Sequence, residues 1–558
     1  MNRRLSWLVG ALLSAVVAFG VGPLRAEAPP DLVVVISLDQ FRHDYLERFR
    51  THFSPGGFNL LLEQGANFTD CHFLHSITKT APGHAVMLTG VHANLNGIIA
   101  NDWIDRASFE RVSCVGDPAE QIVGLPPPTA ARLPGYLDPY LGRSPRHLLV
   151  TTVGDTLKLD RGGRPKVIGI SNKDRAAILM SGKLADAAYF MEAGHMVTST
   201  YYMKQLPAWV KAWNDADKAR AYFGKMWDRV LPEADYAVQG ADDAPGEFDG
   251  MGLGRTFPKK ITGGDDTPTP NFYDTIFHTP FSSELLADFA CAAIENEQLG
   301  RRGVTDLLCV SFSATDYIGH DYGPDSHEVM DNVIRTDRIL EKFFQFLDAK
   351  VGLKHCTIIL TADHGTAPLP EHVTEQSQGR IPAGRIDLKQ MLVTLEAALD
   401  RKFGPRAGNG GWLVTDDAWL LVLPDALKEK NLTSAAVQTV VRDTLLSLDF
   451  VQAAYTRAQL EAGDVQGELG QRALLSFNHE RSGDVFFQAK PYFVNKEKYG
   501  TNHGTPYNYD THVPLLWYGV GVKAGTYSQR VATEDLAPTL AHILALPAPP
   551  LCNGHVLF

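Results

Sequence analysis

The chain has 558 residues and a mass of 61.2 kDa; 44% of its residues are hydrophobic and 21% are charged, which excludes a disordered or collagen-like protein. Its 52 basic against 64 acidic residues give a formal net charge of −12, which argues against a protein that binds nucleic acids or anionic membranes. An anionic substrate would therefore have to be attracted by a local site.

The N-terminus is typical of a secretory signal peptide. Arg3–Arg4 form a basic start, and residues 5–21 form an apolar run. Residues 24–26 form a small-residue cleavage region before the acidic Glu27. The alternative is an uncleaved membrane anchor, because the run approaches spanning length, but three glycines weaken such a span. We expect a cleaved signal peptide, residues 1–26, no stable membrane anchor, and a periplasmic or secreted mature protein.

Four short apolar runs have the character of fully buried strands, and each leads into polar residues. They are Leu32–Leu38, Lys166–Ile170, Asp306–Phe312 and Cys356–Thr361. Between the last two, apolar residues recur at helical spacing from Val329 to Leu347. Continuous apolar strands that alternate with amphipathic helices predict an α/β fold, with a mostly parallel central sheet and helices on both faces. Ligands of such sheets bind outside the carboxyl ends of the strands.

Two stretches depart from this pattern. Residues from about 185 to 280 are rich in Tyr, Trp, Asp and Gly, and residues from about 370 to 495 contain a new strand, Ala418–Leu423. We interpret both as insertions into one catalytic domain, residues 27–558. The chain then returns to the main sheet at Thr511–Tyr518.

The six cysteines permit up to three disulfides in an oxidising compartment. Six cysteines allow 15 pairings, and among them we choose Cys71 with Cys114. The sequence has no CxxC motif, which argues against a thiolate metal cluster and against thioredoxin chemistry.

The segment Thr78–His84 is the first candidate for chemistry. Thr80 is a good N-cap and Pro82 a good early-helix residue, so a helix is expected to run to about Leu88. A hydroxyl there lies among unpaired N–H groups at the positive end of the helix dipole, which suits an anion. The alternative is that Thr80 only caps the helix.

Carboxylates and imidazoles follow several predicted strands. Three Asp and three His in these positions form an oxygen- and nitrogen-rich set suited to zinc or a similar divalent ion. They are Asp39, Asp316, Asp363, His320, His364 and His503. Any single one could instead cap a helix or fill the core. His72, His75, His84, His512 and His542 are interpreted as structural.

Together and in this order, the motifs resemble the alkaline phosphatase superfamily, and most closely its PafA-type phosphomonoesterases. The resemblance extends from about Val33 to residues 535–546. It is carried by Ser37–Asp39, Thr80–His84, Asn101–Trp103, Asn172–Arg175, Asp316–His320, Ala362–Gly365 and His503–Gly504.

The resemblance implies a site with two Zn²⁺ ions per chain. Asp39, Thr80, Asp363 and His364 would surround one ion, and Asp316, His320 and His503 would hold the other. Thr80 would be the nucleophile, forming a phospho-threonine that water then hydrolyses. The same resemblance implies small phosphorylated substrates, and we expect a monomer.

Asn101, Lys173 and Arg175 would bind the substrate phosphate. In a strand-like segment, residues 173 and 175 point to the same face, so both cations could reach one phosphate. The alternative is a surface strand whose basic residues face solvent. Within the resemblance, these three residues indicate a phosphate monoesterase.

Two other functions compete with this interpretation. A phosphodiesterase or nucleotide pyrophosphatase would share the two-metal core, but Ala81 after the Thr and the Lys-x-Arg pattern favour a monoesterase. A non-catalytic exported protein that binds zinc or phosphate would be expected to lack a ligand or the nucleophile. A sulfatase is disfavoured because no C/S-x-P-x-R context is present.

Overall fold

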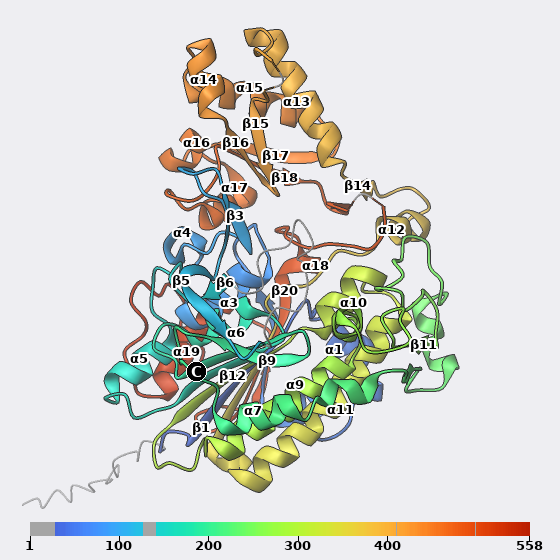
Figure 1. Cartoon of the computed structure of the whole chain (residues 1–558), viewed down its shortest axis with the longest axis vertical. Coiled ribbons are helices and arrows are strands. Elements are labelled where there is room, and N and C mark those ends of the chain that lie inside the picture. The colour runs from blue at the N-terminus through green and yellow to red at the C-terminus, as the bar shows by residue number, and fades with distance from the viewer. Residues whose placement is uncertain (1–27, 126–140, 409, 497) are drawn as a thin grey trace, which may run out of the picture.

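The computed structural model describes residues 28–125, 141–408, 410–496 and 498–558 (Figure 1). The expected signal peptide, residues 1–26, lies outside these residues. Within the described part of the chain, no helix is both long enough and apolar enough to cross a membrane.

A sheet of twelve strands in the described residues forms the centre of the molecule. Its five central strands, β13, β1, β12, β7 and β8, run parallel, while β20 on one side and β9 on the other are antiparallel to their neighbours. In spatial order the strands are β21 (Gly525–Tyr527), β2 (Ala66–His72), β20 (His512–Gly519), β13 (Cys356–Thr361), β1 (Leu32–Leu38), β12 (Asp306–Phe312), β7 (Val167–Ser171), β8 (Ala187–Glu192), β9 (His195–Ser199), β5 (Gly116–Val123) and β6 (Leu141–Arg143), with β22 (Val531–Ala532) paired to β2.

The central strands form because their sequences are apolar on both faces. All residues of β1, β12 and β13 are buried, and these three strands have the predicted bounds. The predicted strand at Lys166–Ile170 begins and ends one residue later, as β7. The predicted mostly parallel sheet is confirmed.

Helices cover both faces of this sheet (Figure 1). One layer contains α3 (Thr80–Thr89), α5 (Val153–Asp160), α6 (Asp174–Ser181) and α19 (Leu536–Ile543), and the other contains α2 (Phe58–Gln64), α7 (Ala208–Asp215), α8 (Pro270–Phe277), α9 (Phe281–Asn296), α10 (Ala314–Tyr322) and α11 (His327–Lys350). The predicted amphipathic helix between residues 329 and 347 corresponds to α11.

A separate subdomain stands at one end of the molecule, in orange at the top of Figure 1. Its antiparallel sheet has the order β15-β16-β18-β17, and its apolar side chains form their own core. The elements are α13 (Leu388–Phe403), β15 (Leu413–Asp416), β16 (Trp419–Val422), α14 (Pro424–Lys430), α15 (Ser434–Leu446), β17 (Val451–Thr456), α16 (Arg457–Ala462), α17 (Gly467–Ser476) and β18 (Val485–Ala489).

Short elements connect these parts. They are α1 (Tyr45–Arg48), α4 (Ala93–Asn96), β3 (Asp102–Ile104), β4 (Arg111–Ser113), β10 (Met226–Trp227), β11 (Lys259–Lys260), α12 (Pro370–Gln376), β14 (Gly384–Arg385), β19 (Phe493–Val494) and α18 (Asn508–Thr511).

The region interpreted as a first insertion differs from expectation at its start. β8 and β9 lie within the predicted range of about 185 to 280, yet both pair in the central sheet. The physical reason is that β8 is buried over its first five residues and continues the parallel order of β7. The irregular region, with its short helices and two-residue strands, begins after β9.

The chosen disulfide is wrong. All six cysteines, which lie within the described residues, are unpaired. Cys71 is buried in the core around the central sheet, whereas Cys114 is buried in a different apolar cluster that contains Ala81 and Ile178. Two thiols enclosed in separate clusters cannot meet without repacking both.

Candidate active site and metal centre

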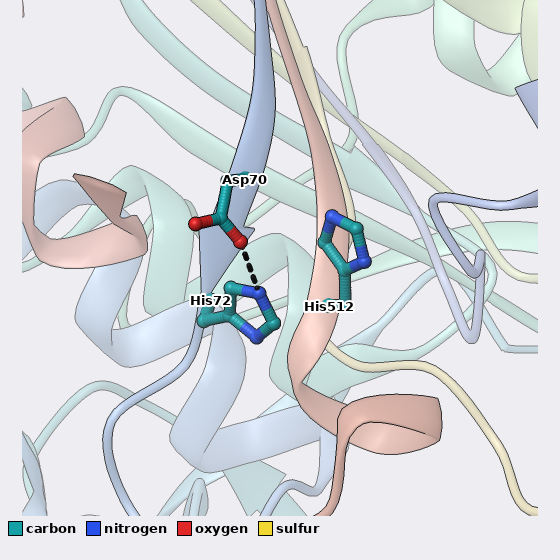
Figure 2. Close-up of side chains that lie close together, drawn as sticks. All are labelled: Asp70, His72 and His512. Atoms are coloured by element: carbon teal, nitrogen blue, oxygen red, sulfur yellow. Dashed lines mark hydrogen bonds and ion pairs between the residues drawn. The ribbon is translucent and has the colours of Figure 1, made fainter. Parts of the chain in front are cut away.

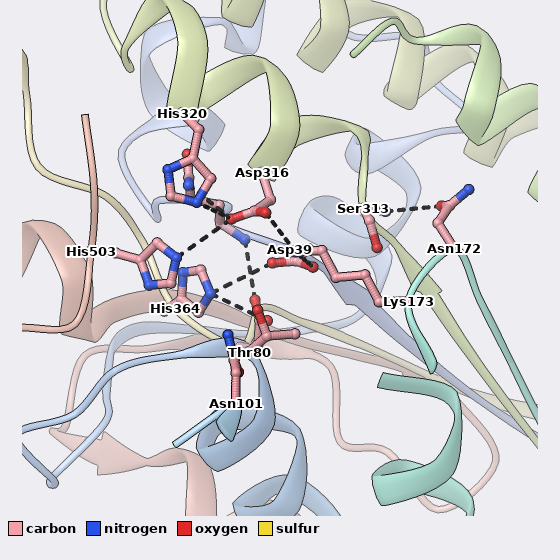
Figure 3. Close-up of polar contacts among 12 residues, drawn as sticks. Asp39, Thr80, Asn101, Asn172, Lys173, Ser313, Asp316, His320, His364 and His503 are labelled. Carbon is pink, nitrogen blue, oxygen red and sulfur yellow. Dashed lines mark hydrogen bonds and ion pairs between the residues drawn. The ribbon is translucent and has the colours of Figure 1, made fainter. Parts of the chain in front are cut away.

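The predicted site residues converge at the carboxyl ends of four adjacent strands. Asp39 follows β1, Asp363 follows β13, Lys173 follows β7, and Asp316 lies in the first turn of α10 after β12. Figure 3 shows the side chains of Asp39, Asp316 and Lys173 turned toward a common centre, with Thr80 and Asn101 beside it. The parallel order of the four strands places these residues together.

Asp39, Asp363 and His364 form the first of two groups suited to a metal ion. Each offers one ligand atom, and these atoms lie within 4.8 Å of one another. All three side chains are 0% exposed. Asp39 Oδ1 and His364 Nε2, 3.5 Å apart, have no hydrogen-bond partner among the described residues. Buried polar atoms without a partner are costly, so a bound cation would satisfy them.

Asp316, His320 and His503 form the second group, with ligand atoms again within 4.8 Å of one another. Asp316 Oδ1 lies 3.3 Å from His320 Nε2 and 3.6 Å from His503 Nε2. The His503 and His364 rings stack with centroids 3.5 Å apart, which brings the two groups side by side.

The three histidines of these groups share one hydrogen-bond arrangement. Nδ1 of His320 lies 2.9 Å from the Thr501 carbonyl, Nδ1 of His503 lies 2.8 Å from the Thr78 carbonyl, and Nδ1 of His364 lies 2.9 Å from its neighbour's carbonyl. A carbonyl only accepts, so each Nδ1 carries the proton and each Nε2 lone pair faces the carboxylates. Histidines that bind metals in proteins are held in this way, so the residues fit a divalent ion.

Electrostatics favour the deprotonated forms of three of these ligands, Asp316, Asp363 and His503. Burial acts to raise the pKa of Asp316, but Lys173 and His320 lower it well below its usual range. The pKa of Asp363 is also lowered, since His364 and His84 outweigh its burial. Burial lowers the pKa of His503, as do the neighbouring His364 and His320. Anionic carboxylates and neutral imidazoles are the forms that bind a metal ion.

Asp39 behaves differently from the other two carboxyl groups. Burial, followed by repulsion from Asp316 and Asp363, raises its pKa well above the ordinary value. Three carboxylates enclosed at one strand edge therefore need positive charge nearby, and one amine partly supplies it. Lys173 Nζ lies 2.6 Å from Asp39 Oδ2 and 2.5 Å from Asp316 Oδ2.

The segment carrying Lys173 and Arg175 is not a strand, so that prediction is wrong. β7 ends at Ser171, Lys173 is the N-cap of α6, and Arg175 lies in the first turn of that helix. Asp174 Oδ1 accepts a hydrogen bond from the Arg175 backbone N–H at 2.6 Å. Both cations nevertheless lie at the carboxyl edge of the sheet, and Arg175 Nε is buried without a hydrogen-bond partner in the described residues.

Thr80 begins α3 and is not its cap. The N-cap is Lys79, and Thr80 is the first helical residue, 1% exposed. The helix runs to Thr89, one residue beyond the predicted end. Asn101 Oδ1 accepts a hydrogen bond from the Ala81 N–H at 2.8 Å, which holds Asn101 against this helix start. Figure 3 shows Thr80 beside Asn101 and below His364.

Sequence reasoning missed two residues of this site. His84 was interpreted as structural, yet its Nδ1 lies 2.7 Å from the Thr80 carbonyl and 3.2 Å from Asp363 Oδ2. Its position four residues after Thr80, on the same helix face, is a signal that could have revealed it. Gln40 was not considered, although it contacts both groups.

A third cluster of similar composition lies away from this centre. Asp70, His72 and His512 offer ligand atoms within 4.8 Å of one another, and Figure 2 shows Asp70 bonded to His72. His512 Nε2 lies 3.0 Å from the Thr69 carbonyl and so carries a proton there. Nδ1 of His72 lies 3.1 Å from Thr511 Oγ1, and the structural role expected for His72 and His512 stays a prediction.

Comparison with known proteins gives the chain its relatives. Residues 33–512 match the family model described as type I phosphodiesterase/nucleotide pyrophosphatase. The chain is 33% identical to the alkaline phosphatase PhoV of Synechococcus elongatus, over 95% of this chain and 92% of that protein. It is 32% identical to the alkaline phosphatase PafA of Elizabethkingia meningoseptica, over 97% and 96%. A Myroides odoratus protein named calcium-transporting ATPase is 34% identical over 94% and 93%.

A solved structure of PafA superimposes with a TM-score of 0.86, covering 95% of this chain and 98% of that chain at 32% identity. This overlap includes the central sheet and the inserted segments alike. The expected alkaline-phosphatase-like fold is confirmed.

Proposed function

The chain belongs to the type I phosphodiesterase/nucleotide pyrophosphatase family, and we propose that within it the protein is a PafA-type alkaline phosphatase that releases inorganic phosphate from phosphate monoesters. Relatives named alkaline phosphatase match nearly the whole chain. The observation that carries the proposal is the pair of Asp/His groups beside Thr80, with two cations at the same strand edge.

The two Asp/His groups would each hold one Zn²⁺, the first with Thr80 as an additional ligand. When bound, the ions supply positive charge that stabilises the nucleophile and the leaving oxygen. Imidazole and carboxylate ligands suit zinc. The chain itself contributes the orientation of these ligands, because each histidine is fixed by its Nδ1 hydrogen bond.

Thr80 would attack the phosphorus atom. Its Oγ1 forms a bond to phosphorus as the ester bond to the alcohol breaks, which leaves a phospho-threonine and a free alcohol. Water then cleaves the phospho-threonine and releases inorganic phosphate. The start of α3 suits this role, because the positive end of the helix dipole favours a negatively charged phosphoryl group.

Asn101, Lys173 and Arg175 would bind the non-bridging oxygens. A monoester dianion carries more charge on these oxygens than a diester does, so two cations discriminate between them. Asp174 helps to position the segment that carries Lys173 and Arg175. It accepts hydrogen bonds from the Arg175 backbone N–H at 2.6 Å and from Arg143 Nε at 2.7 Å.

The test compares hydrolysis of p-nitrophenyl phosphate with that of bis-p-nitrophenyl phosphate, with zinc determined on the same purified sample. We expect a strong preference for the monoester and two zinc ions per chain. Lys173→Ala with Arg175→Ala should lower kcat/KM for the monoester by about 10²–10³-fold and affect the diester far less. Preference for the diester would instead assign the chain a phosphodiesterase activity, and equal losses on both substrates would remove the proposed role of the two cations.

We further propose that the protein is exported as a soluble monomer to the periplasm or the medium. Export is supported by the basic and apolar N-terminus of the sequence. Cell fractionation of a strain expressing the full chain, with N-terminal sequencing of the mature protein, tests this. Cleavage after Ala26 or Ala28 is expected, and retention of Met1 in the cytoplasmic fraction would contradict export.

A further inference from the structure

Gln40, directly after Asp39, has an unusual backbone for its residue type. Its φ is +61°, in the left-handed region that favours glycine. It occupies the third position of a β-turn, in which the Phe41 N–H donates to the Leu38 carbonyl at 3.2 Å. Its side chain is completely buried. A non-glycine residue held in this conformation beside a functional site indicates a role for its side chain.

The two hydrogen bonds of Gln40 go to both metal-binding groups. Its backbone N–H donates to Asp363 Oδ1 at 3.1 Å, and its side-chain Nε2 donates to Asp316 Oδ1 at 2.9 Å. Asp363 belongs to the first group and Asp316 to the second. A single residue, itself next to Asp39, therefore contacts the carboxylates of both groups.

Each bond orients a carboxylate toward its histidines. With Oδ1 of Asp363 held by Gln40, its Oδ2 lies 3.4 Å from His364 Nε2. The Asp316 Oδ1 that accepts from Gln40 also faces His320 Nε2, at 3.3 Å. Hydrogen bonds of this kind fix the direction of ligand oxygens and tune the affinity of the metal site.

The side-chain amide of Gln40 occupies space that only a glycine at position 319 leaves open. A Cβ added at Gly319 in α10 would lie 2.0 Å from Gln40 Oε1. Oε1 has no hydrogen-bond partner in the described residues, and a carboxylate can only accept, so the amide must present Nε2 to Asp316. Gly319 thus leaves room for the one orientation that reaches Asp316.

We propose that Gln40 is a positioning residue of the metal centre: it orients Asp363 and Asp316 together, so that the two groups hold their ions at the same time. This inference rests on the two-zinc function proposed above. It adds a residue that neither binds the metal nor contacts the substrate. It also assigns Gly319 the role of leaving space for the Gln40 side-chain amide in the orientation that reaches Asp316.

The test measures zinc retained per chain across a series of chelator concentrations, by elemental analysis of the full-length holoenzyme. Gln40→Ala removes the amide, and Gln40→Gly removes it while suiting the positive φ. We expect both variants to lose zinc at about 10- to 100-fold lower chelator concentration than the wild type. Their kcat/KM at limiting zinc should fall in parallel and recover in excess zinc. Gln438→Ala, which removes a buried amide from α15, should behave as wild type.

Gly319→Ala tests the same contact from the other side. It should reproduce the zinc loss of Gln40→Ala, and it should add nothing in the double variant, because the amide it displaces is then absent. Additive effects would overturn the proposed contact.

A purely structural role for residue 40 makes the opposite prediction. Gln40→Gly would then retain two zinc ions at the same chelator concentration as the wild type, which would overturn the inference alone. A wild-type protein that binds no zinc at any concentration would overturn both this inference and the proposed two-zinc function.

Discussion

Two hydrogen bonds restrain the backbone at Thr80, and neither of them involves its hydroxyl group. The Thr80 carbonyl accepts a hydrogen bond from His84 Nδ1 at 2.7 Å, and the next backbone N–H is held by Asn101 at 2.8 Å. These contacts restrain the backbone on both sides of the Cα atom. A nucleophile held in this way loses little freedom when it attacks.

Replacing Thr80 by Ala should therefore abolish turnover without unfolding the protein. We expect kcat for p-nitrophenyl phosphate to fall by more than about 10³-fold, because the nucleophile is lost while the carbonyl and N–H contacts remain. Zinc content should stay near that of the wild type, since three protein ligands of the first group persist.

Two companion variants separate the hydroxyl from the helix. Thr80→Ser should retain measurable turnover, because it keeps a hydroxyl. Thr89→Ala, at the other end of α3, removes a buried hydroxyl that donates to the Ala85 carbonyl at 2.6 Å, and should leave kcat unchanged. Normal turnover in Thr80→Ala would remove Thr80 from the nucleophile role.

At this scale, the sequence predicted side chains that follow strands and missed those defined by distant partners. Asp39 and Asp363 could be placed because parallel strand ends meet at one edge. Gln40 could not, because its amide contacts Asp316, 276 residues away in the chain. A single glutamine forms no catalytic or metal-binding pattern that can be recognised in a sequence. Only its contact in the folded protein reveals the role of Gln40.

At the scale of elements, α3 approaches the metal-binding loop more closely than a side chain would allow. A Cβ at Gly83 would lie 2.2 Å from the Asp363 carbonyl oxygen and 2.9 Å from its carbonyl carbon. Backbone cannot move aside as a flexible side chain can. This glycine therefore sets the distance between the helix that carries Thr80 and the strand end that carries Asp363.

Gly83→Ala should push α3 away from Asp363 and misalign the site. We expect kcat/KM to fall by about 10²-fold, because a shift of about 1 Å in a catalytic group has this effect. The free energy of unfolding should fall by about 1–3 kcal/mol from overpacking. Activity assays and chemical denaturation measure the two effects.

Gly411→Ala provides the matched control for this change. Its nearest neighbour is a Glu396 side-chain oxygen at 3.3 Å, and Gly411 lies between α13 and β15 of the inserted subdomain. Wild-type activity and stability in Gly83→Ala would show that α3 does not need this close approach.

The elements that were predicted correctly are those whose sequences carry a strong local pattern. β1 and β12 are continuous apolar runs bounded by polar residues. The segment 173–175 has alternating character over three residues, which is too short to distinguish a strand from a first helical turn. In the folded chain β7 ends at Ser171, and Asp174 is the first residue of α6.

At the scale of the whole molecule, the inserted subdomain contacts the segment that leads into Thr80 at several points, and one of these contacts is an ion pair. Asp417, in the turn between β15 and β16, pairs with Lys79, the residue before Thr80. Their side chains are 32% and 18% exposed. Burial acts to raise the pKa of Asp417, but Lys79 lowers it below the ordinary value. Asn495 also donates to Asp417 Oδ1 at 3.1 Å.

Sequence alone could not reveal this connection. The range 370–495 was interpreted as an insertion because its composition departs from the sheet pattern, and such patterns say nothing about which residue touches the domain below. Asp417 has a φ of +55°, and its partner lies 338 positions earlier in the chain. Only the folded arrangement joins the tip of a β-turn to the start of α3.

Asp417→Ala should therefore reduce catalysis from a position outside the site. Loss of the partner frees Lys79, the N-cap of α3, and so loosens the helix start that carries Thr80. A partly exposed ion pair contributes about 1 kcal/mol. If all of this energy serves to orient Thr80 for attack, its loss corresponds to about a fivefold fall in kcat. Zinc content should be unchanged, because no metal-binding group contains Asp417.

The control is Asp425→Ala, which removes an exposed acid of the same subdomain paired with Arg406. Equal kcat values in the two variants would mean that the subdomain is anchored beside the active site without acting on it.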